Sequence, residues 1–159
     1  MIKCEILENE KILRLYPKYD SESGILEIQT KTPTDWVFGL DINGTIIFDI
    51  NDKFIIENID ILIPKWKWEK YSGKLPWSEK VLKNKSVIFT KETINKKSFY
   101  INEGIQAFFD DKNLFFGFSS NSKYDILNKS KGIILSEDCY LLIQESYIVG
   151  VILAKDKIN

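Results

Sequence analysis

DINGTIIFDINDKFIIENIDILI, residues 41–63, is the stretch that decides the fold class of this chain. Asn43 and Gly44 both tolerate a positive φ, which a type I′ hairpin turn requires at two consecutive positions. From Thr45 to Ile50 the large apolar side chains recur at every second residue, as they do on one face of a β-strand. The stretch therefore predicts two antiparallel strands joined by a tight turn.

A further strand follows, and its apolar face changes register at Glu57. In an uninterrupted strand, Phe54 and Ile56 would share a face with the polar Asn58. One extra residue at this point, a β-bulge, would instead place Phe54 and Ile56 on the same face as Ile59. We therefore predict a bulge at Glu57 and Asn58.

Parts of this region recur near the C-terminus. Residues 19–28 align without gaps with residues 109–118, since both read aromatic, Asp, three turn residues and then a strand. Residues 50–56 align with residues 143–149, and Gly150 then falls opposite the expected bulge. The two blocks recur in the same order at offsets of 90 and 93 residues, which predicts an internal duplication.

Composition agrees with a packed β domain. The 159 residues are 44% hydrophobic and 13% aromatic, which is enough for a buried core, and Ile, Phe, Tyr and Val favour strands. We predict a mainly β fold of two tandem antiparallel β-meanders, residues 1–63 and 98–159, packed as a sandwich or as half-barrels. The connecting segment, residues 64–97, is expected to contain one short helix from Pro76 to Leu82. The side chains expected to be buried are Phe48, Phe54, Ile59, Phe116, Tyr147 and Ile152.

The sequence favours a cytoplasmic location. No apolar run approaches the ~20 residues that span a membrane, and the N-terminus has no apolar segment typical of a signal peptide. Cys4 and Cys139 lie far apart without a CxxC pattern. Two such cysteines are typical of reduced core residues.

Charge is distributed unevenly along the chain, although the net charge is only −1. Residues 1–63 carry a net charge of −6, residues 64–100 carry +7 and residues 101–159 carry −2. A basic middle segment thus separates two acidic copies, which is a pattern that bears on partners rather than on fold.

The first copy resembles a small uncharacterised bacterial β-meander family over residues 16–62. The matching positions are Tyr19, Asp20, Leu26, Ile28, Asp49, Asp52 and 59–62. The chain departs from the family pattern where that pattern has glycine, with Lys53 at the turn and Glu57 and Asn58 before the last strand. The resemblance implies a compact antiparallel meander and assigns no activity or site.

Catalytic motifs are absent from the sequence. The chain has no histidine, which removes the usual general base and the commonest transition-metal ligand. It has no phosphate-binding glycine-rich loop, and the carboxylates at Asp49 and Asp52 lack the glutamate that a calcium loop needs. The acidic pairs of the second copy fall in expected turns. We therefore expect no catalytic residues, no metal and no cofactor.

A basic and aromatic stretch follows Pro64, and it allows two interpretations. Cations alternate there with rings that can stack on bases, as in single-strand nucleic-acid grooves. The alternative, which we favour, is that Trp66 and Trp68 pack inward from a strand whose lysines face water. The candidate nucleic-acid-binding residues are Lys65, Trp66, Lys67, Trp68, Lys70, Tyr71 and Lys74.

The favoured hypothesis is a non-enzymatic protein-binding module. Small β proteins with uneven charge and no catalytic motif resemble bacterial immunity proteins, which neutralise a toxin domain by covering its active site. The acidic first copy would complement a basic toxin, for example a nuclease. The candidate partner-binding residues are Asp35, Asp41, Asp49, Asp52, Glu57 and Asp60. The alternatives are a nucleic-acid-binding module using residues 64–77 and a structural subunit that associates with itself through exposed strand edges.

Overall fold

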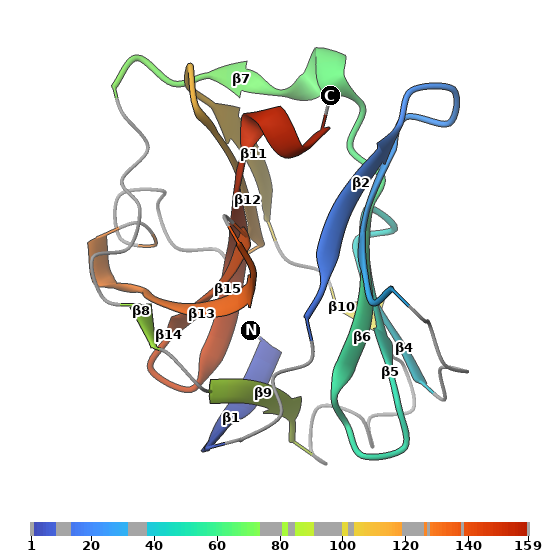
Figure 1. The fold of residues 1–159 in the computed structure, drawn as a ribbon, viewed down its shortest axis with the longest axis vertical. Coiled ribbons are helices and arrows are strands. Elements are labelled where there is room, and N and C mark those ends of the chain that lie inside the picture. The colour runs from blue at the N-terminus through green and yellow to red at the C-terminus, as the bar shows by residue number, and fades with distance from the viewer. Residues whose placement is uncertain are drawn as a thin grey trace.

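The protein folds as a sandwich of two β-sheets (Figure 1). This computed structural model describes residues 2–8, 14–31, 38–73, 81–82, 85–90, 100–101, 104–118, 126, 128–137 and 139–158. Nearly all regular elements in these ranges are strands. The predicted mainly β class is thereby confirmed.

The first sheet has six strands and contains the described strands of the first copy except the N-terminal one. Its order is β10 (Tyr100–Ile101), β4 (Phe38–Ile42), β5 (Ile46–Ile50), β6 (Ile56–Ile61), β3 (Ile25–Gln29) and β2 (Tyr16–Asp20). All pairings are antiparallel except that of β10 with β4.

The second sheet has nine strands and contains the described strands of the second copy except β10. Its main order is β7 (Glu69–Lys70), β11 (Ile105–Phe109), β12 (Asn113–Phe118), β15 (Tyr147–Ala154), β14 (Cys139–Gln144), β13 (Lys131–Ser136) and β8 (Val81–Leu82). β1 (Ile2–Glu8) pairs with β15 and with β9 (Lys85–Phe89). The N-terminal strand therefore belongs to the sheet of the second copy.

The two copies have the same topology, which confirms the predicted duplication. In each, a hairpin (β2–β3 or β11–β12) pairs through its second strand with the last strand of a three-stranded meander (β4–β5–β6 or β13–β14–β15). A 3₁₀ turn follows each meander, η1 (Lys65–Lys67) in the first copy and η2 (Lys155–Ile158) in the second.

The hairpin alignment needs one correction. In the first copy, four residues separate the paired Asp20 and Ile25, whereas two separate Asp110 from Asn113 in the second. The second strands are therefore displaced by two residues from the gapless alignment. A shift of two leaves every side chain on the same face of its strand, so the pattern remained recognisable.

The predicted bulge lies at Glu57. Asn58 is opposite Asp49 while Ile56 is opposite Ile50, so Glu57 is the extra residue in β6. In β15 the extra residue is Val149 rather than Gly150, because the register shifts between the partners of Leu142 and Ile143. Glycine is favoured at position 150 for a different reason. A Cβ there would clash with the carbonyl oxygen of Phe116, because the two atoms would lie only 2.7 Å apart.

Local turn chemistry was predicted correctly, but the helix was not. Asn43 and Gly44 have φ values of 56° and 65°, and Thr45 N donates to Ile42 O, as a type I′ turn requires. Val81 and Leu82, expected to end a helix, instead form strand β8. The rest of that expected helix lies outside the described residues.

The main core fills the space between the sheets. Phe48, Ile59 and Phe116 are fully buried there, as predicted. Ile152 is also fully buried, but in a second apolar cluster on the other side of the nine-stranded sheet. Phe54 and Tyr147 were expected to be buried and are only half-buried. Phe54 lies in the β5–β6 turn with a φ of 63° and stacks on Phe38.

The copies interlock at one end of the sandwich. After the first copy, η1 and β7 cross over the top in Figure 1, and β7 pairs with β11 of the second copy. After the second copy, η2 packs against β2 of the first. The element that follows each meander therefore contacts the sheet of the other copy.

Both cysteines are free thiols in the core. Burial raises the pKa of Cys4 and the pKa of Cys139 to about 12 each, so the reactive thiolate form is scarce. No helix in the described part of the chain is long and apolar enough to cross a membrane.

Candidate functional site

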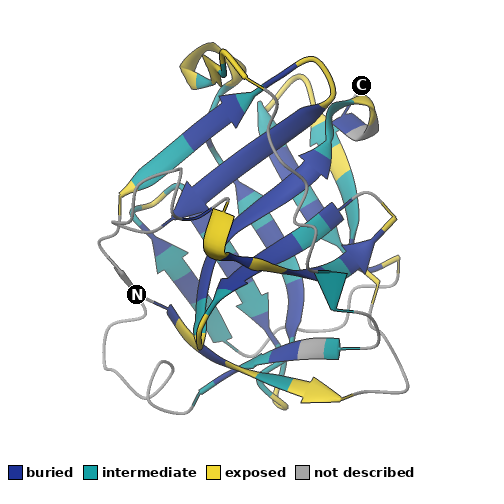
Figure 2. Cartoon of the chain, turned by 90° about the vertical axis from the view of Figure 1, so that its left-hand side faces the viewer, coloured by how far each residue is buried: buried dark blue, intermediate teal, exposed yellow. Residues whose placement is uncertain are grey.

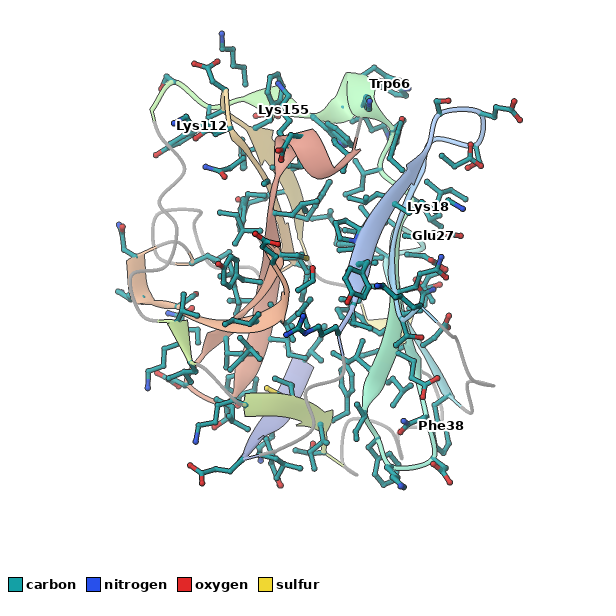
Figure 3. The ribbon with its side chains drawn as sticks, viewed as in Figure 1. Lys18, Glu27, Phe38, Trp66, Lys112 and Lys155 are labelled. Atoms are coloured by element: carbon teal, nitrogen blue, oxygen red, sulfur yellow. The ribbon has the colours of Figure 1, made fainter. Side chains whose placement is uncertain are left out.

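The outer face of the six-stranded sheet brings four carboxylates together. One cross-strand row runs from β4 to β2 through Asp41, Ile47, Asp60, Glu27 and Lys18. Their neighbours along each strand point to the core, so this row points away from it. Figure 3 shows Lys18 and Glu27 on the side of the sheet that faces away from the second sheet.

The adjacent row adds the fourth carboxylate. Asp49 on β5 is opposite Asn58 on β6. The amide of Asn58 donates from Nδ2 to Asp49 Oδ2 at 3.1 Å and to Asp60 Oδ1 at 2.8 Å. We call Glu27, Asp41, Asp49 and Asp60 the acidic face. Lys18 lies in the first cross-strand row, so the four carboxylates and Lys18 together carry a net charge of −3.

Asp49 is in an unfavourable position for a charged group. Partial burial raises the pKa of the Asp49 carboxyl, and the nearby charge of Asp60 raises it further. The hydrogen bond from Asn58 opposes this shift without cancelling it. The folded protein therefore binds a proton at Asp49 more tightly than the unfolded chain does. The ionised carboxylate costs stability at neutral pH.

Replacing Asp49 with asparagine is expected to raise the melting temperature at pH 7. Because the folded-state pKa is above the unfolded value, the penalty is present at pH above that folded pKa. This stability penalty disappears as the pH falls through the folded-state and then the unfolded-state pKa of Asp49. The gain in melting temperature of Asp49→Asn should therefore disappear at low pH. Melting curves of Asp49→Asn between pH 3 and pH 8 measure this.

Asp52→Asn is the control, because Asp52 is exposed in the β5–β6 turn. It should change the melting temperature little at any pH. A stability loss at pH 7 in Asp49→Asn would contradict the unfavourable placement of the Asp49 charge.

The other predicted carboxylates are placed differently. Glu57 was expected to be exposed and is buried in the bulge, where Glu57 Oε1 accepts a hydrogen bond from Asn51 Nδ2 at 3.0 Å. Asp52 is in a turn rather than on the sheet, and Asp35 lies outside the described residues. Sequence reasoning missed Glu27, although its alternation with Leu26 and Ile28 already placed it on the outer side of a strand.

The equivalent row of the second copy is apolar. It runs from β13 to β11 through Ile134, Tyr140, Ile152, Phe115 and Phe108. Most of these side chains belong to the second apolar cluster, which Ile126 also joins. Figure 2 shows this side of the molecule, where the central strands are largely buried. The two copies thus share a fold but have opposite chemistry on their outer faces.

The basic and aromatic stretch forms a 3₁₀ turn, not the strand that would pack both tryptophans inward. Trp66 is 79% exposed, and Lys67 Nζ lies 5.1 Å from the centroid of its ring. Trp68 instead packs against the core, with ring centroids 6.2 Å from Tyr19 and 5.7 Å from Phe116. Its indole Nε1 donates to Ile63 O at 2.9 Å.

The remaining members of the stretch do not form one surface. Lys65 Nζ lies 4.1 Å from the ring centroid of Tyr19, and Tyr71 packs edge-on against Phe108 in the second apolar cluster. Lys70 is exposed on β7, while Lys74 lies outside the described residues. The rings of Trp68 and Tyr71 are engaged in packing, so Trp66 is the ring of this stretch that is mostly open to a partner.

The two tryptophans should respond differently to truncation. Trp68→Ala is expected to lower the free energy of unfolding by about 2–4 kcal/mol, because it removes a ring packed between the sheets. Trp66→Ala is the matched control and should change it by less than about 0.5 kcal/mol. Urea denaturation monitored by circular dichroism measures both. Equal losses would contradict the different packing of the two rings.

Among the described residues, no group of three or more Cys, Asp or Glu side chains is placed to bind a metal ion. Comparison with protein-family models finds no match for this chain, and no curated protein is detectably similar to it. The family resemblance of the first copy therefore stays a prediction.

Proposed function

We propose that the protein is a non-enzymatic protein-binding module, a bacterial immunity protein that neutralises a toxin domain by binding it in the cytoplasm. The acidic face of the six-stranded sheet is the proposed binding surface. In this proposal the protein needs no cofactor and catalyses no reaction.

The observation that carries the proposal is the difference between the two outer faces. In the second copy, the cross-strand row consists of Ile and aromatic side chains, and it takes part in an apolar cluster with Ile126. In the first copy, the same row contains three carboxylates, and no described element covers it in Figure 1. A charged face in one copy, where the equivalent face of the other copy is buried and apolar, is a candidate for an intermolecular role.

Asp49 strengthens this argument. An ionised carboxylate with a raised pKa lowers stability, and an uncharged side chain would fit the position better. Residues that cost stability are characteristic of binding and catalytic sites rather than of scaffolds. We infer that the charge at Asp49 is retained for a partner.

The chemistry of the face defines the class of partner. Four carboxylates within one sheet create a negative potential that attracts a basic protein and accelerates its association. Nuclease toxins carry basic surfaces because they bind phosphate backbones. A basic nuclease domain is therefore the proposed partner.

A nucleic-acid-binding module is the second candidate, and the exposed Trp66 favours it. The ring is flanked by Lys65 and Lys67, and exposed aromatics between cations stack on bases. The candidate is weaker because Lys65 lies over Tyr19 and Trp68 packs in the core.

Self-association is the third possibility, since a homo-oligomer is compatible with both binding functions.

Co-expression tests the proposed function. The proposal predicts that a neighbouring gene encodes a toxin domain, that this domain arrests growth of a bacterial host when expressed alone, and that co-expression of this protein restores growth. The purified pair should elute together as a complex. Continued growth arrest, together with salt-sensitive binding of the protein to a single-stranded oligonucleotide, would replace the immunity assignment by the nucleic-acid-binding one.

A further inference from the structure

A cavity of about 270 Å³ lies beside β11, at the interlocked end of the sandwich. It is smaller than the pockets of about 300–1,000 Å³ that take drug-sized ligands. Its wall includes polar side chains, the opposite charges of Lys67 and Glu69, and the apolar Ile63. The lining residues are Thr45, Ile63, Lys67, Glu69, Ile105, Gln106, Ala107 and Phe108.

Among the described residues, no strand pairs with part of the edge of β11 at this cavity. Within the described residues, β7 pairs with β11 at Phe108 and Phe109 only. N-terminal to Glu69, the chain turns away from β11 into the 3₁₀ turn η1. The cavity occupies the space along β11 that a longer β7 would have filled.

The direction of the backbone groups follows from one hydrogen bond. Tyr71 N donates to Phe109 O at 2.7 Å, so the backbone of Phe109 points to the β7 edge. Alternate residues of a strand direct their backbone groups to the same edge. The backbone N–H and C=O of Ile105 and the backbone N–H of Ala107 therefore point to this edge. In the described part of the chain, β7 ends before it reaches these groups.

We propose that this open edge binds an extended peptide segment of a partner protein as an added strand. Backbone donors and acceptors in a row bind an extended backbone in many peptide-recognition domains. Lys67 and Glu69, on the wall of the cavity, favour a segment with one acidic and one basic side chain. Trp66 does not line the cavity, but its exposed ring lies beside Lys67, which does.

This site is separate from the acidic face, and the inference does not depend on the immunity function. None of Glu27, Asp41, Asp49 and Asp60 lines the cavity. Loss of one site would leave the other intact.

Amide hydrogen exchange measured by NMR tests the open edge in the free protein. The N–H of Ala107 is expected to exchange at least about tenfold faster than those of Gln106 and Phe108, which point to β12. Equal protection at all three amides would show that the edge is already paired and would overturn the proposal.

Two blocked pentapeptides are the probes for binding, Ac-Glu-Val-Thr-Val-Lys-NH₂ and Ac-Lys-Val-Thr-Val-Glu-NH₂. At least one is expected, at millimolar concentration, to slow exchange of the Ala107 N–H and shift the Trp66 indole signal. A peptide with proline at its centre, which lacks a backbone donor, should bind less well. No change with either probe would overturn the proposal.

Lys67→Glu tests the charge contact without touching the core, because Lys67 is exposed. It is expected to weaken the preferred peptide about two- to fivefold relative to the other. Lys53→Glu, in the exposed β5–β6 turn, is the matched control and should preserve the preference. An unchanged preference in Lys67→Glu would contradict the proposed placement of the peptide beside Lys67 and overturn the proposal.

Discussion

Phe116→Ala is expected to lower the free energy of unfolding by about 3–5 kcal/mol, one of the two largest effects that this structure implies. Phe116 is fully buried on the inner side of β12, and its ring meets that of Trp68 edge-on at 5.7 Å. Removing it opens a cavity between the sheets and leaves Trp68 with Tyr19 alone of the two rings that the described residues pack against it. Urea denaturation measures the loss.

Phe38→Ala is the control for this substitution. Phe38 is half-buried at the end of β4 and stacks on Phe54 with a centroid distance of 5.7 Å. Its truncation should cost about 1–2 kcal/mol, because less of the ring is removed from water. A loss below 1 kcal/mol in Phe116→Ala would contradict the position of the core between the sheets.

Reversing the charge of the acidic face is expected to slow association with the basic partner about 10- to 1,000-fold at low salt. The triple variant Glu27→Lys, Asp49→Asn, Asp60→Lys changes the charge of the face by +5 and leaves the inner face untouched. Its association rate should also lose most of its dependence on ionic strength. Stopped-flow kinetics with the toxin domain measures both quantities.

The matched control places the same charge change elsewhere. Asp111→Lys, Glu137→Gln, Asp156→Lys also changes the charge by +5, at exposed positions of the second copy. It should slow association much less, because these charges do not lie on the acidic face. If both triple variants slowed association equally, net charge alone would explain the effect.

Local backbone requirements explain which parts of the fold could be predicted from sequence. The type I′ turn needs positive φ at Asn43 and Gly44, and the bulge at Glu57 is required for Ile56 and Ile59 to face the core together. Both signals are contained within a few residues. The duplication was visible because equivalent turns recur, with Asp20 and Asp110 each accepting hydrogen bonds from backbone N–H groups in their turns.

Non-local pairing explains what was missed in the fold. β1 joins the sheet of the second copy, and β7 pairs with β11, through contacts between segments far apart in the sequence. Strand periodicity alone does not specify a partner strand. Val81 and Leu82 form β8 by pairing with Gly132 and Ile133 of β13, and this pairing overrides the weak helical signal after Pro76.

The candidate site was predicted only in part, because strand alternation is a local signal and the direction of a side chain in a bulge is not. Alternation along β4, β5 and β6 places Asp41, Asp49 and Asp60 on one side. Glu57 was misassigned because the bulge turns its side chain inward, toward Asn51. The second mistake concerns Trp66 and Trp68, because two residues at a spacing of two do not distinguish a strand from a 3₁₀ turn.

The most direct test of the central claim is a calorimetric titration of the toxin domain with three proteins, the wild type, the acidic-face triple variant and the matched control. The acidic face is predicted to be the binding surface. Wild type and control should therefore bind with one-to-one stoichiometry and comparable affinity, while the acidic-face variant binds at least about 100-fold more weakly. Undiminished binding by the acidic-face variant, in a folded protein that melts at or above the wild-type temperature, would contradict the account.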